Sequence, residues 1–357
     1  MERQLRRFTQ SLDQCPARTG PWASAVGLTN EYSWSAVLSS LQAPVTLKGS
    51  RMRIRGLICI AVGLMLTVAA AWAEEVTVVS DVLGPEGPLF VDGNLYYVAW
   101  TSGTLSKWDG KTTTVLNSLP GCSHNGLAFT KQKTFLLACC DEHGAILELD
   151  MKGKQLRRWD ADDKGTKFDG GINDIVVTAS GGAYATVFGP YRSVPTAVAG
   201  RILYLAPGGR QWGEVANDLN YANGIGVSPD QATLYVSETV GNCILRFAIN
   251  ADGSLGHRSN FALLNRLTPN KNDSWWLGPD SMKIDGKGNM YVAQWFGGKI
   301  LKIAPDGTLL HVFPIAAGDG TTNVAFGPGG KDLYVTVVRD PNDPHAKGSI
   351  VRIPNVE

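Results

Sequence analysis

The sequence predicts an all-β fold, a six-bladed β-propeller whose ring is closed by an N-terminal strand that completes the last blade. Short runs of Tyr, Val and Ile alternate with turn residues, among them many of the 41 Gly and 18 Pro, as is typical of β-sheet proteins. After Glu74, six segments of similar design follow one another. In each, a polar residue opens an apolar strand, and two further strands follow across tight turns.

The spacing of these segments favours a propeller over a sandwich. The six openings lie at residues 86, 125, 173, 223, 280 and 322. Repeats of about 40–55 residues with three or four strands are typical of propeller blades, whereas a β-sandwich does not explain six equivalent openings. The last repeat has no room for a fourth strand after Ile353, and Glu75–Val79 can supply it, which leaves no open edge.

The region before the first repeat has the features of a secretory signal peptide. Arg51, Arg53 and Arg55 precede an apolar run over residues 56–71, which ends in an Ala-Trp-Ala sequence at Ala73. A membrane anchor is the alternative, although the run is short for a comfortable span. We therefore expect a periplasmic or secreted protein with no stable membrane span after signal cleavage.

The position of this signal also predicts the organisation of the chain. Because a signal peptide begins at the N-terminus, we expect Met52 to be the true start. Residues 1–51 are then a non-native or disordered extension, residues 52–73 the signal peptide, and residues 74–357 the propeller catalytic domain.

Charge and cysteine content exclude several classes of function. Residues 1–73 hold eight Lys/Arg and three Asp/Glu, so the remaining chain has 25 basic and 29 acidic residues, a net charge near −4. Such a chain offers no basic face for nucleic acid. The cysteines of this part do not have the spacing of a zinc site; a bridge from Cys122 to Cys139 or Cys140 is compatible with an oxidising compartment, and buried thiols are the alternative for these and for Cys243.

The openings of the six repeats carry oxygen atoms to one end of the central channel. The first strand of each blade lines that channel, so its opening residues meet around one axis: Glu86, Asn125, Asn173, Asn223, Asp280 and Thr322. Two carboxylates in an apolar core need a counter-charge, and this column contains no Lys or Arg. Oxygen-only ligation suits Ca²⁺ or Mg²⁺ better than Zn²⁺, and we expect Ca²⁺, with Mg²⁺, Mn²⁺ or Zn²⁺ as alternatives. Asn and Asp also open strands simply as turn residues, which explains Glu86 less well.

Over roughly residues 80–355 the chain resembles the senescence-marker-protein/gluconolactonase (regucalcin-like) family of calcium-dependent propellers. The resemblance rests on Glu86-Gly-Pro, Asn173-Asp174, Asn223-Gly224 and Pro279-Asp280. In that family a Glu, two Asn and an Asp hold the metal, which implies Glu86, Asn173, Asn223 and Asp280 here, with Asp280 also the catalytic carboxylate. The motifs look closest to the drug-responsive lactonases.

The resemblance implies a calcium-dependent hydrolase of a small lactone or ester, in which water attacks a metal-polarised carbonyl with Asp280 as base. One departure bears on the substrate: sugar lactonases often carry an Arg that contacts substrate where this chain has Gly171. A phosphotriesterase on the same metal site and a non-enzymatic calcium-binding scaffold are the alternative functions.

Further residues are candidates for supporting the ligands or touching the substrate. His124 could shuttle a proton or merely be accommodated beside a turn, and Asp174 could orient ligands or cap a turn. Two long excursions, residues 188–199 and 265–277, are expected over the channel mouth, where Trp275-Trp276 forms a lid or packs between blades. The full set is Asn125, His124, Asp174, Ser281, Thr322, Tyr191, Arg192 and Trp276.

Overall fold

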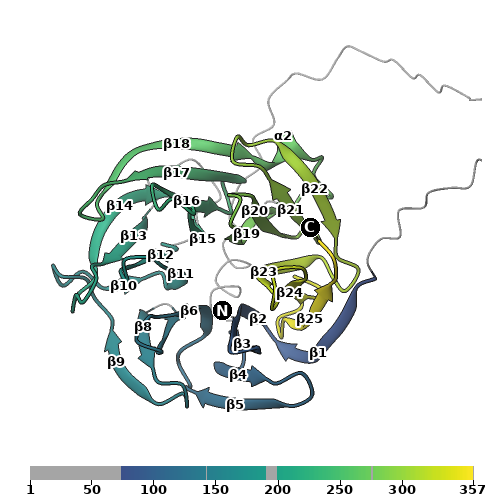
Figure 1. The fold of residues 1–357 in the computed structure, drawn as a ribbon, viewed down its shortest axis with the longest axis horizontal. Helices are drawn as coiled ribbons and strands as arrows, with labels where there is room; N and C mark the ends of the chain where they lie inside the picture. Colours follow the sequence, from purple (N-terminus) through teal and green to yellow (C-terminus); the bar gives the residue numbers. More distant parts are fainter. Residues whose placement is uncertain (1–73, 142, 190–198, 275, 357) are drawn as a thin grey trace, which may run out of the picture. The chain divides into compact units, whose positions relative to one another are not determined.

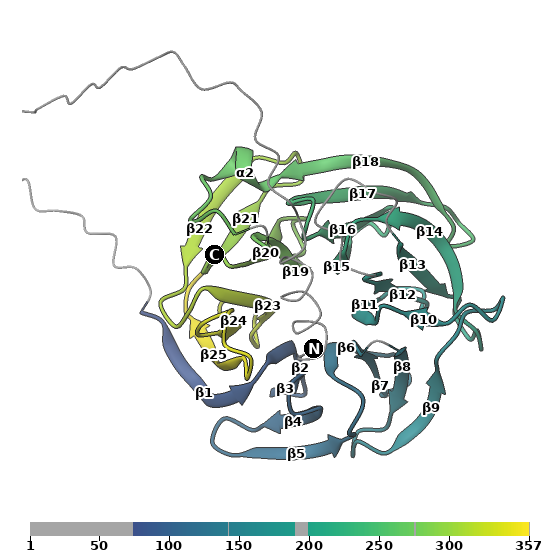
Figure 2. The same cartoon turned by 180° about the vertical axis from the view of Figure 1, so that it is seen from behind.

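The computed structural model describes residues 74–141, 143–189, 199–274 and 276–356. Within these ranges the chain forms six antiparallel sheets around a central axis, as Figure 1 and, from behind, Figure 2 show. The predicted six-bladed propeller is confirmed. The signal peptide and the extension expected over residues 1–73 lie outside the described residues.

In the first five blades the strands follow one another outward from the axis, except that β9 and β10 of the second blade both pair with β8. The first two sheets contain β2 (Pro85–Val91), β3 (Asn94–Ala99), β4 (Thr104–Trp108) and β5 (Thr113–Ser118), then β6 (His124–Phe129), β7 (Phe135–Cys139), β8 (His143–Leu149), β9 (Gln155–Trp159) and β10 (Phe168–Asp169). The next two contain β11 (Ile172–Val177), β12 (Ala183–Val187), β13 (Gly200–Leu205) and β14 (Gly213–Leu219), then β15 (Ala222–Val227), β16 (Thr233–Glu238), β17 (Cys243–Ile249) and β18 (Leu255–Leu263). The short helix α2 (Leu264–Leu267) leads to the fifth sheet, with β19 (Gly278–Ile284), β20 (Met290–Trp295), β21 (Lys299–Ile303) and β22 (Leu309–Pro314).

The sixth blade joins the two ends of the propeller. Its strands are β23 (Gly320–Phe326), β24 (Leu333–Val338), β25 (Lys347–Ile353) and, on the outside, β1 (Val76–Leu83). Strand β1 pairs antiparallel with β25, and Val79 lies opposite Ile350. The closing strand expected at residues 75–79 is therefore present and extends to Leu83, so the outer edge of β25 is paired.

Burial decreases from the axis to the rim. Every residue of β7 is buried, whereas β5 and β9 are mostly exposed. The apolar side chains of neighbouring blades pack together; one such cluster joins Trp159 and Phe168 of the second blade to Leu203 and Trp212 of the third. This packing between blades holds the inner strands in fixed positions around the channel.

Two of the cysteines are bonded. Cys122 and Cys139 form a disulfide between the segment before β6 and the end of β7, while Cys140 and Cys243 are free. The bridge to Cys139, one of the two pairings left open by the sequence, is thus the one present. Among the helices in the described part of the chain, none has the length and apolar character needed to cross a membrane.

Candidate active site

The six strands nearest the axis carry the same irregularity at the same place. Strands β2, β6, β11, β15, β19 and β23 lie closest to the centre of the ring (Figure 1), and each has a β-bulge near its beginning. A bulge leaves one residue unpaired and re-aims its side chain. The residues that directly follow the last regular pair are Gly87, Asn125, Asn173, Asn223, Asp280 and Thr322.

The first blade differs from the expected column by one residue. Glu86 still forms a regular pair with Val98, and Gly87 takes the bulge position with φ of 52°. Glu86 is nevertheless buried at the centre, with 2% of its surface exposed. Its Oε2 accepts hydrogen bonds from Gly87 N (2.5 Å) and from Asn323 Nδ2 (2.7 Å) on the last inner strand.

Glycines let the inner strands approach one another closely. A Cβ on Gly126 would lie 2.5 Å from Cα of Asp174, and one on Gly224 would lie 2.4 Å from Cα of Ser281. Neither distance is compatible with a side chain. The glycines that follow Asn125 and Asn223 are therefore what allow neighbouring inner strands to approach one another this closely.

Three carboxyl groups are buried together there. Glu86, Asp174 and Asp280 have 2%, 1% and 7% of their surfaces exposed. Burial first, and then repulsion from Asp174, raises the pKa of Glu86 to about 8. Burial and the charge of Glu86 raise the pKa of Asp280 well above its ordinary value, against the opposing effect of the Asn223 side chain. The three acids cannot all ionise without positive charge nearby.

A lysine supplies part of that charge, which sequence reasoning missed. No Lys or Arg occupies the bulge positions, but Nζ of Lys283 lies 4.0 Å from Oδ2 of Asp174. It also donates to Oδ1 of Asn323 at 3.3 Å. The available signal was a lysine within an inner strand, three residues after Asp280.

The amide oxygens of two blades are buried without partners. Oδ1 of Asn173 and Oδ1 of Asn223 accept no hydrogen bond from the described residues, although Nδ2 of Asn223 donates to Thr239 Oγ1 at 3.0 Å. Buried acceptors of this kind are costly unless something binds them. Together with the carboxylates of Glu86 and Asp280 they would make an oxygen-only donor set, the kind of set that a hard divalent cation such as Ca²⁺ prefers.

The ligand set predicted from the sequence includes amide oxygens as well as carboxylates. Across the described ranges, no group of three or more His, Cys, Asp or Glu side chains is arranged to hold a metal ion. The donor set named above contains two carboxylates and two amides, so it depends on Asn oxygens for half of its ligands.

The remaining candidates are engaged in different ways. The hydroxyl group of Thr322 hydrogen-bonds to Pro85 O (2.8 Å) and to Thr336 Oγ1 (2.7 Å). The bond to Pro85 joins the last blade to the first, at the contact between these blades that we call the seam. Both ring nitrogens of His124 face protein oxygens, Nδ1 at 2.5 Å from Cys122 O and Nε2 at 3.1 Å from Asn117 Oδ1. Burial lowers the pKa of His124. Oγ of Ser281 is buried and has no hydrogen-bond partner in the described part of the chain.

Two polar groups near the carboxyls were not anticipated. The side chain of Asn125 bonds to the Cys140 thiol, whose pKa is raised to about 12 by burial and by neighbouring acids that include Glu86. Burial and the nearby Cys140 and Asp280 raise the pKa of Tyr221. Cys140 and Tyr221 both lie in connections between strands. The alternating sequence pattern of the strands does not predict where side chains point in such connections.

Aromatic side chains pack beside this end of the channel. Tyr221 stacks on Phe188 at 4.7 Å between ring centres, and Trp276 meets Tyr221 edge-on at 4.9 Å. Trp276 thus packs against Tyr221, in the connection that leads into β15. Tyr191, Arg192 and Trp275 lie outside the described residues.

The backbone at Gly171 explains why a side chain is missing there. Gly171 has φ of 89°, and a Cβ would lie 2.7 Å from Cys140 O. An arginine at this position would collide with the backbone of the second blade. The arginine that sugar lactonases often carry at this position, where it contacts substrate, therefore does not fit in this chain.

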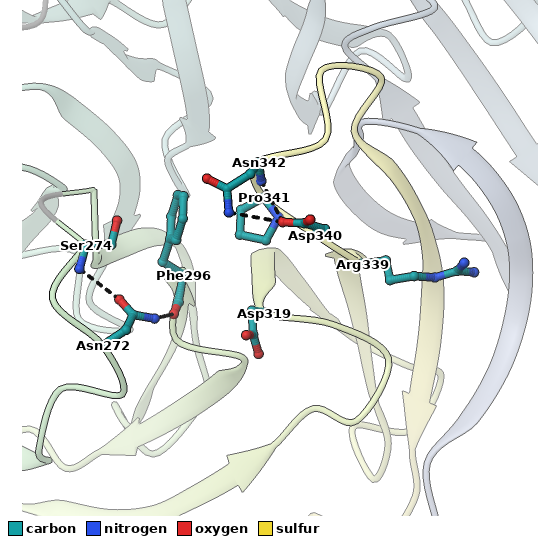
Figure 3. A pocket seen from close by; sticks show the side chains of 8 residues that line it. All are labelled: Asn272, Ser274, Phe296, Asp319, Arg339, Asp340, Pro341 and Asn342. Atoms are coloured by element: carbon teal, nitrogen blue, oxygen red, sulfur yellow. Dashed lines mark hydrogen bonds between the residues drawn. The ribbon is translucent and has the colours of Figure 1, made fainter.

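A separate open cavity of about 500 Å³ lies between the fifth and sixth blades (Figure 3). It contains none of the predicted metal ligands. Asn272 braces one wall through hydrogen bonds with Phe296 O and Ser274 N, while Arg339 extends away from the other labelled side chains. The cavity is lined by Asn272, Ser274, Phe296, Asp319, Arg339, Asp340, Pro341 and Asn342.

The fold and its sequence match one family across most of the chain. Residues 84–339 match the SMP-30/Gluconolactonase/LRE-like region. The chain is 27% identical over 254 residues to the lactonase drp35 of Staphylococcus epidermidis, covering 68% of this chain and 74% of that protein. It is similar in structure to a gluconolactonase from Xanthomonas campestris, with a TM-score of 0.64, 24% identity and coverage of 81% and 93% of the two chains. A calcium-binding regucalcin from Agrobacterium tumefaciens gives a TM-score of 0.63, 24% identity and coverage of 80% and 94%. The chain belongs to the SMP-30/gluconolactonase/LRE-like family.

Proposed function

We propose that this chain is a hydrolase of small lactones or related carboxylic esters that works with one divalent cation, Ca²⁺ in the first instance. The observation that carries the proposal is the joint burial of Glu86 and Asp280 with the unpartnered amide oxygens of Asn173 and Asn223. Family membership and the similarity to a named lactonase support the same reaction class.

The four residues would hold the cation, and Asp280 would act on water. When bound, the cation supplies the positive charge that keeps both carboxylates ionised and polarises the lactone carbonyl. Asp280 accepts a proton from the attacking water as the water oxygen bonds to the carbonyl carbon. When the ring C–O bond breaks, Asp280 returns that proton to the leaving oxygen, and the product is a hydroxy acid.

The surroundings of Asp280 suit the role of a base. Its carboxyl is buried, which excludes bulk water, and the backbone N–H of Ser281 bonds to it. That donor and the Asn223 side chain lower the pKa of Asp280, but burial and the charge of Glu86 raise it more, so the role of base depends on the positive charge that a bound cation would supply. The same contacts fix its orientation on β19.

A closed position at Gly171 bears on substrate choice. Because no side chain fits there, an arginine cannot bind the hydroxyl groups of a sugar lactone from this site. We propose that gluconolactone-type polyols are poorer substrates than small lactones without several hydroxyl groups.

The function is tested with a panel of lactones and phosphotriesters assayed with and without EDTA. We expect lactone hydrolysis that EDTA abolishes and Ca²⁺ restores. Asp280→Asn should lower kcat by about 10²–10⁴-fold, as for loss of a general base, with an unchanged circular dichroism spectrum.

A matched control is Asp306→Asn, at an exposed turn of the same sheet, which should retain full activity. Turnover of phosphotriesters alone would favour the phosphotriesterase alternative, and no EDTA-sensitive hydrolysis of either class would favour a binding scaffold. Full activity of Asp280→Asn would exclude the assigned base.

A further inference from the structure

Lys283 is a charged residue at a position that is otherwise uncharged in the inner strands. It lies three residues after the bulge position of β19, and its side chain is 30% exposed. The corresponding residues of the other inner strands are Phe90, Ala128, Val176, Gly226 and Ala325. A lysine among such residues costs desolvation unless its ammonium group is paired.

The ammonium group of Lys283 is connected to two of the three buried acids. It lies 4.0 Å from Oδ2 of Asp174, an atom that accepts no hydrogen bond from the described residues. It donates to Oδ1 of Asn323 at 3.3 Å, and Nδ2 of Asn323 donates to Oε2 of Glu86 at 2.7 Å. Lys283 therefore faces Asp174 directly and Glu86 through one amide.

The same contacts fix the orientation of the amide. Oδ1 of Asn323 also accepts the backbone N–H of Val324 at 2.8 Å. With two donors on its oxygen, the Asn323 amide must present its nitrogen to Glu86. Glu86 Oε2 is then occupied by Asn323 and Gly87, while no hydrogen bond from the described residues reaches Oε1.

Counting charges gives Lys283 a definite role. Glu86, Asp174 and Asp280 carry three negative charges when ionised, and one divalent cation compensates two of them. We propose that Lys283 is the fixed counter-ion of this centre, a positioning residue that lets a single divalent cation complete the charge balance. The charge balance with a divalent cation rests on the proposed function. The pairing of Lys283 with Asp174 does not depend on it.

The test is a double-mutant cycle on the full chain with Lys283→Met, Asp174→Asn and the double variant. Lys283→Arg keeps the charge, and Lys287→Met removes an exposed lysine from the hairpin that follows β19. Two quantities are measured for each protein: the Tm in EDTA, and the affinity for CaCl₂ by calorimetry after EDTA has been removed.

Charge balance predicts shifts of opposite sign that cancel. The positive charge of Lys283 beside the buried acids opposes binding of a cation there, so Lys283→Met should bind Ca²⁺ about tenfold more tightly or better, and Asp174→Asn about tenfold less tightly. The double variant should return to within about threefold of the wild type. In EDTA, Lys283→Met should lower the Tm, and adding Asp174→Asn should restore part of that loss.

Lys283→Arg should stay close to the wild type in both measurements, and Lys287→Met should be unchanged. Additive Tm losses in the double variant, or an unchanged Ca²⁺ affinity in Lys283→Met, would overturn the proposal. If Lys283→Met does not fold, Lys283→Arg and the double variant still decide it. A wild type that binds no Ca²⁺ would remove the cation from the proposed function, while the Tm cycle in EDTA would still decide the pairing.

Discussion

At the scale of single residues, the centre is shaped as much by missing side chains as by those present. Gly126, Gly171 and Gly224 each stand where a Cβ would meet a neighbouring backbone. Two of them bring adjacent inner strands together beneath the carboxyls. Gly171 instead packs on Cys140, whose thiol lies close to Glu86, and so sets the position of the second blade against the third.

This role of Gly171 predicts a measurable steric cost. Gly171→Ala combines a left-handed backbone, φ of 89°, with a contact of 2.7 Å to Cys140 O. Gly165 also has positive φ, 79°, but a Cβ there meets nothing within 4 Å. Gly165→Ala should cost about 1 kcal/mol of unfolding free energy from backbone strain alone, and Gly171→Ala about 2–4 kcal/mol.

Urea denaturation of the two variants measures the difference. Equal losses in the two alanine variants would mean that the blade interface yields without cost. In that case the absence of a side chain at residue 171 would have no steric cause.

At the scale of the element, the inner strands show what a sequence pattern can and cannot locate. In five of the inner strands the polar residue that opens the repeat lies at the bulge. These five residues all have the same spacing to the next apolar residue of the strand, and the sequence alignment therefore placed them correctly. Glu86 lies one residue earlier, because it is itself the last regularly paired residue of β2, and Gly87 and Pro88 occupy the bulge before Leu89 as Asn125 and Gly126 do in β6 before Leu127. The roles of Lys283 and Asn323 could not be predicted from the sequence, because both contact residues of other blades. The repeat pattern carries no information about contacts between blades.

Ring closure by β1 is the element-scale feature most open to test. Val79 is 9% exposed and lies opposite Ile350, whereas Val76 on the same strand is 42% exposed. Val79→Asp buries an unpaired charge and should cost about 2–4 kcal/mol, while Val76→Asp should stay within about 0.5 kcal/mol of the wild type. Thermal denaturation in parallel distinguishes them; a Val79→Asp protein as stable as Val76→Asp would mean that β1 contributes little to closure.

At the scale of the whole molecule, the buried acids make stability depend on pH. Without a cation, Glu86 has a pKa of about 8 in the folded chain against 4.5 as its ordinary value. The folded state then binds more protons than the unfolded state between these limits. The free energy of unfolding is therefore highest below about pH 4.5. It falls by up to about 1.4 kcal/mol per pH unit as the pH rises towards 8, because ionisation of Glu86 is less favourable in the folded state.

We therefore expect the Tm in EDTA to fall between pH 5 and pH 8. The Glu86→Gln variant lacks this group and should show a smaller slope. With Ca²⁺ in excess the wild-type slope should flatten or reverse, because binding favours ionised carboxylates. A wild-type slope in EDTA no steeper than that of Glu86→Gln would contradict the shift at Glu86.

The ring also imposes an order on how the centre comes together. Glu86 on the first inner strand and Asn323 on the last are bonded although 237 residues separate them, and Thr322 ties the same seam through Pro85. A ribosome releases Glu86, Asn173, Asn223 and Asp280 before it makes Asn323 and the strand that pairs with β1. A chain stopped after the fifth blade thus carries every proposed ligand yet lacks the amide that holds Glu86 in place. The hydrogen bonds that hold Glu86 at the centre are therefore complete only after the sixth blade has been made.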